Sequence, residues 1–177
     1  MKKTENKIQS AFIKLLSSTK IDDIDVQLIC KKLNITRQTF YYHYQNIYDL
    51  IFSIFINNRI KNSKQDDLNS IYGNVVEYLF EDEDFNKKIA ESSASSVLND
   101  FCSSFVNISL LNYLNKYGLN NESKKTFSRF LSKGITEEIL YRFEQGNSKE
   151  DILRSIKLLV NENDVSYLTN SLKTKSL

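Results

Sequence analysis

The chain has 177 residues, of which 41% are hydrophobic and 26% charged, and its formal net charge is +2. It has no proline and only four glycines, so few residues interrupt helices. Runs of alternating polarity rich in β-branched residues, which mark strands, are missing. This composition is that of an ordinary soluble protein. It predicts an all-α fold of about nine helices.

The charge is unevenly distributed along the chain. Residues 1–64 hold eleven Lys and Arg against five acids, a net +6, and residues 65–177 hold thirteen against seventeen, a net −4. A basic segment favours a polyanionic partner through counterion release. The start, MKKTENKIQS, is too polar for a signal peptide, and no run approaches the roughly 18 apolar residues of a membrane span. We expect a cytoplasmic protein that does not associate with a membrane.

Residues 4–17 form the first predicted helix, and a helix-turn-helix pattern follows it in residues 25–44, DVQLICKKLNITRQTFYYHY. Asp25 and Thr36 are natural N-caps for two short helices. Asn34 tolerates the left-handed conformation that the tight turn between them requires. Cys30 lies on the inner face of the first of the two helices. It and Cys102 are the only cysteines, and both are predicted to be buried free thiols rather than a redox pair.

The second helix of this pattern has an apolar and a polar side. Phe40 and Tyr44 fall together toward the preceding helix, while Gln38, Thr39 and Tyr42 point away from it. Arg and Gln donate in forked pairs to guanine and adenine edges, and Thr and Tyr hydroxyls reach phosphate oxygens. The polar side is therefore suited to DNA. The alternative is a packed helical hairpin whose polar side is only solvated.

Residues Ile8, Ala11, Phe12 and Leu15, with the run from Ile24 to Ile51, resemble the DNA-binding domain of the TetR/AcrR family of transcriptional regulators over roughly the first third of the chain. The resemblance places a DNA-binding domain in residues 1–62 and an effector-binding and dimerisation domain in residues 63–177. It implies DNA contacts from the polar set Gln27, Thr36, Arg37, Gln38, Thr39, Tyr41, Tyr42, His43 and Asn46.

The chain departs from the family pattern at two positions. Asn34 stands where the family has Gly in the turn, a mild change. Ile47 stands where the family has a Lys that contacts a backbone phosphate, so Asn46 is left to supply that contact alone.

Apolar periodicity predicts further helices after the helix-turn-helix, at residues 46–62, 67–80, 85–93, 97–117, 122–145 and 149–162, with a frayed polar tail that docks for a turn or two. The acidic residues 81–84 read as a solvated turn, because adjacent acids on a turn seldom close a metal shell. The family resemblance implies that the helices of residues 122–145 and 149–162 pair with their copies in a homodimer. The predicted interface residues are Phe127, Leu131, Gly134, Ile135, Ile152, Ile156 and Leu159. The alternative is that they form the core of a monomer.

Aromatic residues in the middle helices could line a pocket for a small molecule, and the predicted lining is Tyr72, Tyr78, Phe101, Phe105 and Tyr113. Alternatively, these side chains simply fill the core. The chain has one histidine, no glycine-rich phosphate loop and no cluster of metal ligands, so we expect neither an enzyme nor a cofactor or metal site. The family resemblance implies a homodimeric repressor that leaves its double-stranded DNA operator when a small-molecule effector binds. The alternative is a TetR-like coactivator or adaptor that acts mainly through protein contacts.

Overall fold

The computed structural model describes residues 2–58, 60 and 67–174. These residues form α-helices and two short 3-10 helices, and no strand occurs among them. The all-α prediction is confirmed. The elements are α1 (Lys2–Leu16), η1 (Ile21–Asp23), α2 (Val26–Leu33), α3 (Arg37–His43), α4 (Ile47–Asn57), α5 (Leu68–Glu81), α6 (Glu83–Ala90), α7 (Ser95–Tyr113), η2 (Leu114–Tyr117), α8 (Asn121–Glu144), α9 (Lys149–Leu159) and α10 (Glu162–Thr174).

The chain divides into two compact units. The first unit comprises Met1–Arg59 together with Asp82–Leu98, and the second comprises Ile60–Glu81 together with Asn99–Leu177. The predicted domain boundary between residues 62 and 63 lies outside the described residues. Because the first unit includes Asp82–Leu98, helix α6 belongs to the same unit as the helix-turn-helix.

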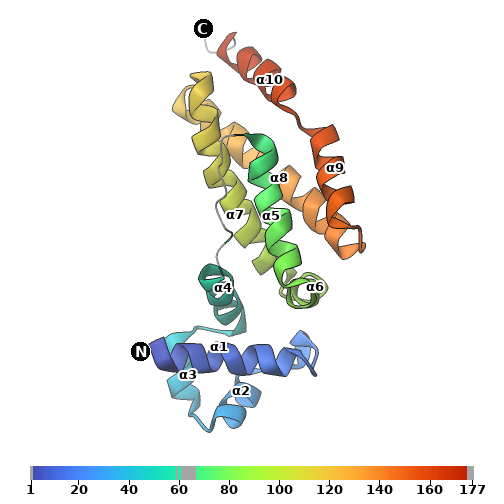
Figure 1. Ribbon diagram of the computed structural model, residues 1–177. Coiled ribbons are helices and arrows are strands. Elements are labelled where there is room, and N and C mark those ends of the chain that lie inside the picture. Colours follow the sequence, from blue (N-terminus) through green and yellow to red (C-terminus); the bar gives the residue numbers. More distant parts are fainter. Residues whose placement is uncertain (1, 59, 61–66, 175–177) are drawn as a thin grey trace. The chain divides into compact units, whose positions relative to one another are not determined.

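In the first unit, α1 lies across α2 and contacts α4, while α2 packs on α3 (Figure 1). Its core is formed by apolar side chains at helical spacing, among which Ile8, Phe12, Ile29, Phe40 and Leu50 have no exposed surface. Phe55 of α4 meets Phe85 of α6 edge to face, with ring centroids 6.0 Å apart. This core fixes the helices that carry the candidate DNA-binding face.

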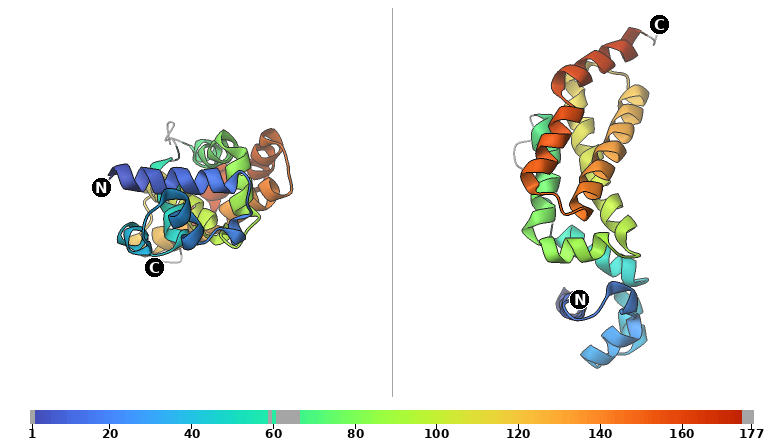
Figure 2. Two further views of the ribbon diagram at one scale, coloured as in Figure 1. Left: turned by 90° about the horizontal axis from the view of Figure 1, so that it is seen from below. Right: turned by 90° about the vertical axis from the view of Figure 1, so that its right-hand side faces the viewer.

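In the second unit, α9 packs against both α5 and α8 (Figure 2). The Tyr72 hydroxyl donates a hydrogen bond to the Val160 carbonyl oxygen over 3.0 Å, and Lys149 Nζ lies 2.5 Å from Glu77 Oε1. Both contacts join α5 to the ends of α9. Among the described residues, no helix is long and apolar enough to cross a membrane.

Three predicted elements have different limits in the structure. Helix α4 ends at Asn57, whereas the helical pattern predicted an end near residue 62, which lies outside the described residues. The helix predicted at residues 97–117 closes with the 3-10 turn η2, and Gly118 after it adopts the left-handed conformation, with φ 64°. The tail was predicted to dock for only a turn or two. This was wrong, because the tail forms the 13-residue helix α10, in which Val165 and Thr169 are buried.

Candidate nucleic-acid interface

The turn between α2 and α3 is closed by short-range contacts. Asp25 Oδ1 accepts a hydrogen bond from Leu28 N over 2.7 Å, and Thr36 Oγ1 accepts one from Thr39 N over 3.1 Å, so both predicted N-caps are confirmed. Asn34 has φ 53° and ψ 49°, the left-handed conformation predicted for it. The Cys30 thiol donates to the Thr36 carbonyl oxygen over 3.6 Å. Burial raises the pKa of this thiol, although the nearby Arg37 guanidinium acts in the opposite direction.

Helix α3 presents a polar face to solvent. Its inner residue Phe40 has no exposed surface, whereas Arg37 and Gln38 are exposed and Tyr42 is 71% exposed. The exposed Tyr41 ring meets Phe40 edge to face at 5.7 Å, so its position is set by the core. Exposed Arg37 and Gln38 at the start of α3, with exposed tyrosines near its end, form the kind of polar face with which a helix-turn-helix reads a major groove.

Arg37 is positioned by a partner on the other helix of the motif. Its Nη2 donates to Gln27 Oε1 over 2.7 Å, and both side chains are exposed. Thr36 Oγ1 and Thr39 Oγ1 lie 2.9 Å apart in a second exposed hydrogen bond. The structure therefore brings four predicted DNA-binding residues into two hydrogen-bonded pairs. In the first pair, Gln27 holds one end of the guanidinium and leaves its remaining donors for an acceptor.

The end of α3 is held by polar contacts from α1 and α4. Gln9 Nε2 donates to the Tyr44 hydroxyl over 3.2 Å and to Ser53 Oγ over 3.1 Å, and Gln9 Oε1 accepts from Asn57 Nδ2 over 3.1 Å. One side chain of α1 thus connects α4 to the residue that ends α3. Sequence patterns gave no signal for this role, because the three partners lie far away in the chain.

His43 is the predicted DNA-binding residue that stands apart from the others. Its side chain is only 6% exposed, and its Nδ1 lies 3.4 Å from Glu5 Oε1 of α1. The structure gives His43 a contact that braces α3 against α1, and it does not place the ring on the exposed face.

Asn46 is the N-cap residue of α4. Its Oδ1 accepts from Asp49 N over 2.9 Å, and Asp49 Oδ2 accepts from Gln45 N over 2.9 Å. Asn46 thus caps the amino end of α4, and Asp49 in its first turn accepts from the residue before the cap. Because the amide oxygen is used in the cap, the two Nδ2 protons of the exposed Asn46 remain as donors for a phosphate oxygen.

A basic groove of about 500 Å³ lies between α1 and α2. It is lined by Lys3, Asn6, Lys7, Ser10, Ala11, Lys14, Lys32 and Leu33. Among the described residues, none of its four lysines forms an ion pair. Lys32 and Gln27 stand about 140° apart around α2, given 3.6 residues per turn. The groove therefore lies beside a flank of α2 that differs from the one carrying the Gln27–Arg37 pair.

No protein-family model matches this chain, and no curated protein matches it. Among solved structures, the chain is similar to a dihydroxyacetone kinase operon activator, DhaS. The two share 26% sequence identity with a TM-score of 0.55, over 88% of this chain and 93% of the other. The match thus spans both units, and that protein has the helical fold of TetR-like regulators.

The predicted effector residues lie mainly inside the second unit. Tyr72, Tyr78 and Tyr113 are buried, and Phe101 stacks obliquely on Tyr78 at a centroid distance of 5.3 Å. The Tyr113 hydroxyl lies 3.0 Å from that of Tyr117. These residues and the half-buried Phe105 belong to α5 and α7. They do not line the basic groove, a second cavity next to α6, or a third next to α9.

The predicted interface residues separate into an inner and an outer set. The inner set is buried within one chain and comprises Phe127, Leu131, Ile135, Ile152 and Ile156, whereas Gly134 and Leu159 are exposed. Phe130 and Leu158, which were not in the predicted set, are 74% and 79% exposed. A cavity of about 220 Å³ opens beside them, lined by Phe130, Leu131, Gly134, Ile135, Glu138, Ile156, Leu159 and Val160. The outward apolar surface therefore overlaps the predicted stripe at Gly134 and Leu159 and extends beyond it to Phe130 and Leu158.

In the described part of the chain, no group of three or more His, Cys, Asp or Glu side chains is placed to hold a metal ion.

Proposed function

We propose that this chain is a TetR-type transcriptional regulator that binds double-stranded DNA as a homodimer and works in the cytoplasm without catalytic activity of its own. The single observation that carries the proposal is the α2–α3 motif. Its turn, both caps and its inner residues are fixed by hydrogen bonds and burial, and its outer residues Arg37, Gln38 and Tyr42 are exposed.

The likeness to DhaS supports the regulatory part of the proposal. That protein is named as an activator of an operon, and the match covers 88% of this chain. The match includes the helix-turn-helix, and its coverage extends the similarity to the second unit as well.

In the proposed complex, Gln38 and Arg37 read base edges. Tyr41, Tyr42, Thr36 and Thr39 contact phosphates through their hydroxyls, and Asn46 does so through its amide donors. Gln27 holds the guanidinium of Arg37 over 2.7 Å and so limits its rotamers before DNA arrives. Because one oriented Arg loses less side-chain entropy on binding, this pair supports specific recognition.

The proposed dimer uses the outward apolar surface of α8 and α9. Leu158 and Leu159 lie in the last turn of α9, and Phe130 lies on α8 beside Gly134. Among the described residues outside the surrounding turn of α8, nothing lies within 4 Å of a Cβ placed on Gly134, so a second helix can approach the backbone closely there. Exposed apolar side chains around a shallow cavity are a typical self-association surface.

For the direction of regulation, the preferred proposal is a repressor that a small molecule, bound among the α5 and α7 aromatics, releases from its operator. The second candidate is an activator or coactivator, in which contact with a partner protein raises transcription. The activator role in the name of DhaS favours this second candidate. The two share the same DNA contact and differ in the sign of their effect on a promoter.

The test is binding of the purified chain to the DNA upstream of its own gene, followed by a reporter fused to that promoter. Saturable binding that random DNA of the same length does not compete away supports the DNA-binding proposal. Deleting the gene then raises reporter output for a repressor and lowers it for an activator. Equal affinity for both DNAs would contradict the proposal.

A further inference from the structure

A cavity of about 560 Å³ lies in the first unit, between the end of α1 and the last turn of α6. It is lined by Leu16, Ser17, Ser18, Thr19, Lys20, Ile21, Asp22, Lys88, Glu91 and Ser92. Leu16 and Ile21 are buried and form an apolar floor, whereas the remaining side chains are polar. The volume is in the range of small-molecule sites, but the lining is more polar than is usual for them, so it suits a ligand with charged or polar ends and a short apolar middle.

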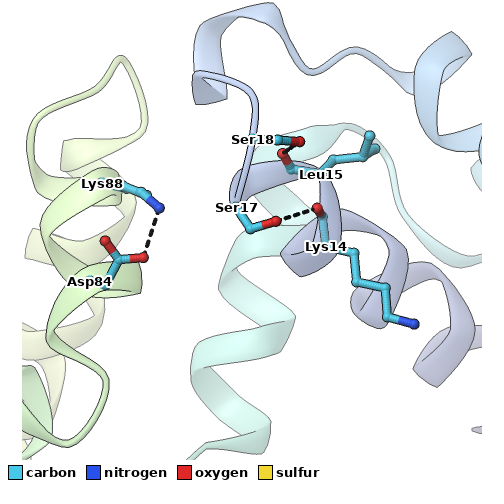
Figure 3. A network of polar contacts seen from close by, with 6 residues as sticks. All are labelled: Lys14, Leu15, Ser17, Ser18, Asp84 and Lys88. Atoms are coloured by element: carbon cyan, nitrogen blue, oxygen red, sulfur yellow. Dashed lines mark hydrogen bonds and ion pairs between the residues drawn. The ribbon is translucent and has the colours of Figure 1, made fainter.

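The serine hydroxyls of this cavity are oriented by the protein itself. Ser17 Oγ donates to the Lys14 carbonyl over 2.9 Å, Ser18 Oγ to the Leu15 carbonyl over 3.4 Å, and Ser92 Oγ to the Ile89 carbonyl over 2.8 Å. Figure 3 shows the first two of these bonds at the end of α1, with Asp84 and Lys88 on the neighbouring helix α6. A hydroxyl has one proton and two lone pairs. With these bonds kept, the Ser17 and Ser18 hydroxyls can only accept from a ligand, and Ser92 Oγ has one lone pair left because it already accepts from Ala94 N over 3.1 Å.

The charges around the cavity also favour a ligand that carries positive charge and donates hydrogen bonds. Lys88 Nζ is bound to Asp84 Oδ2 over 2.7 Å, so this pair is neutral. The other charged residues of the lining are the exposed Asp22, Glu91 and Lys20. Lys20 forms no ion pair in the described part of the chain. These three side chains leave a formal charge of about −1.

Two helix ends add to this negative charge. Helices α1 and α6 end at Leu16 and Ala90, next to the lining residues Ser17 and Glu91, so both direct their carboxyl ends toward the cavity. The carboxyl end of a helix favours a nearby cation. Because the Lys14, Leu15 and Ile89 carbonyl oxygens already accept hydrogen bonds, the two ends add only partial charge to the charge of about −1 on the side chains.

We propose that this cavity binds a small aliphatic diamine. One ammonium group pairs with Glu91 and the other with Asp22, and both donate to the serine hydroxyls, while the methylene chain covers Leu16 and Ile21. Asp22 Oδ1 already accepts from Ser93 N over 3.2 Å, so its second oxygen is the one that meets the ligand. The bound diamine connects α1 to α6 within the unit that carries the helix-turn-helix. The site does not depend on the proposed function, since the binding is a property of the chain without DNA.

The experiment is isothermal titration of the full chain with 1,4-diaminobutane, at constant ionic strength and pH 7. Butane-1,4-diol and butanedioate are comparison ligands of the same length. We expect saturable binding of one diamine per chain and at least tenfold weaker binding of the diol and the dianion. Preferred binding of the dianion through Lys20 and Lys88, or of the diol, would overturn the proposal, as would heats that do not saturate.

Three charge variants locate the site. Glu91→Gln should weaken diamine binding about fivefold, as expected for an exposed pair. Lys20→Gln removes the competing cation and should tighten binding by a similar factor. Glu83→Gln removes the same charge as Glu91→Gln from an exposed position of α6 that does not line the cavity, so it should leave the affinity unchanged. All three positions are exposed and all three variants should fold. Equal losses in Glu91→Gln and Glu83→Gln, or weaker binding in Lys20→Gln, would show that the diamine does not bind in this cavity.

Discussion

Replacing Gln9 tests how the end of the recognition helix is held in place. Gln9 makes two part-buried hydrogen bonds, to the Tyr44 hydroxyl and to Ser53 Oγ, and a more exposed third one with Asn57 Nδ2. A typical intramolecular hydrogen bond contributes about 0.5–1.5 kcal/mol net. The two part-buried bonds therefore contribute about 1–3 kcal/mol together, and the exposed one adds little. Gln9→Ala should lower the free energy of unfolding of the first unit by that amount.

Three comparison variants make the expectation specific. Tyr44→Phe removes only one of the two part-buried bonds and should cost about half as much as Gln9→Ala. Asn57→Ala removes only the exposed bond and should cost less than either. Lys7→Ala introduces the same residue at an exposed position of α1 and should change stability by less than about 0.5 kcal/mol.

Urea unfolding followed by circular dichroism measures all four variants, read from the transition that includes the first unit. A cost for Gln9→Ala no larger than that of Tyr44→Phe would refute the role assigned to this side chain. If Gln9 orients α3, the same variant should also weaken DNA binding, although Gln9 lies on α1 and not on the exposed face of α3.

Three further predictions follow from single positions. Asn34 has φ 53°, so Asn34→Val should cost about 1–2 kcal/mol of stability in urea unfolding, whereas Asn34→Gly should be nearly neutral. Leu159→Asp alters an exposed side chain, so the chain should stay folded by circular dichroism while light scattering shows loss of the proposed dimer; an unchanged mass would refute that interface. Burial raises the pKa of the Cys102 thiol to about 12 from an ordinary value of 9.0. Between pH 9 and pH 12 the Cys102 thiol therefore ionises in the unfolded chain but not in the folded one. The free energy of unfolding should fall above pH 9, and it should fall less in Cys102→Ala.

The local features of the motif could be predicted from the sequence because their causes lie within a few residues. Asp25 caps the amide of Leu28 and Thr36 caps that of Thr39, each three positions along the chain. Asn34 is the residue type, after Gly, that best accepts a left-handed conformation. The 3.6-residue period placed Phe40 on the inner face for the same reason.

Contacts between distant residues could not be predicted in this way. Gln9 meets Tyr44, Ser53 and Asn57 only because α1 packs across the motif, and the residue type alone gives no sign of these partners. Nor does periodicity say what covers an apolar stripe. Of the predicted interface residues, Ile152 and Ile156 are buried within one chain and Leu159 is exposed, as are Phe130 and Leu158 outside that set, and the interface itself stays a prediction.

The tail shows a third limit. Most side chains of α10 are polar, and a terminal segment with so few apolar residues is expected to fray. The structure buries Val165 and Thr169, which stand four residues apart and so share one face of the helix. One buried stripe was enough to dock the whole element.

The central claim is that the exposed face of α3 reads a DNA sequence, and the affinity of Gln38→Ala for two DNAs tests it most directly. Fluorescence anisotropy gives Kd for the upstream DNA of the gene and for random DNA of equal length at one salt concentration. The wild type should prefer the upstream DNA by about a thousandfold or more. Gln38→Ala should lose about 1–3 kcal/mol of binding free energy on that DNA and almost none on random DNA. A wild-type chain that binds both DNAs equally, or a variant that loses the same affinity on both, would contradict the claim.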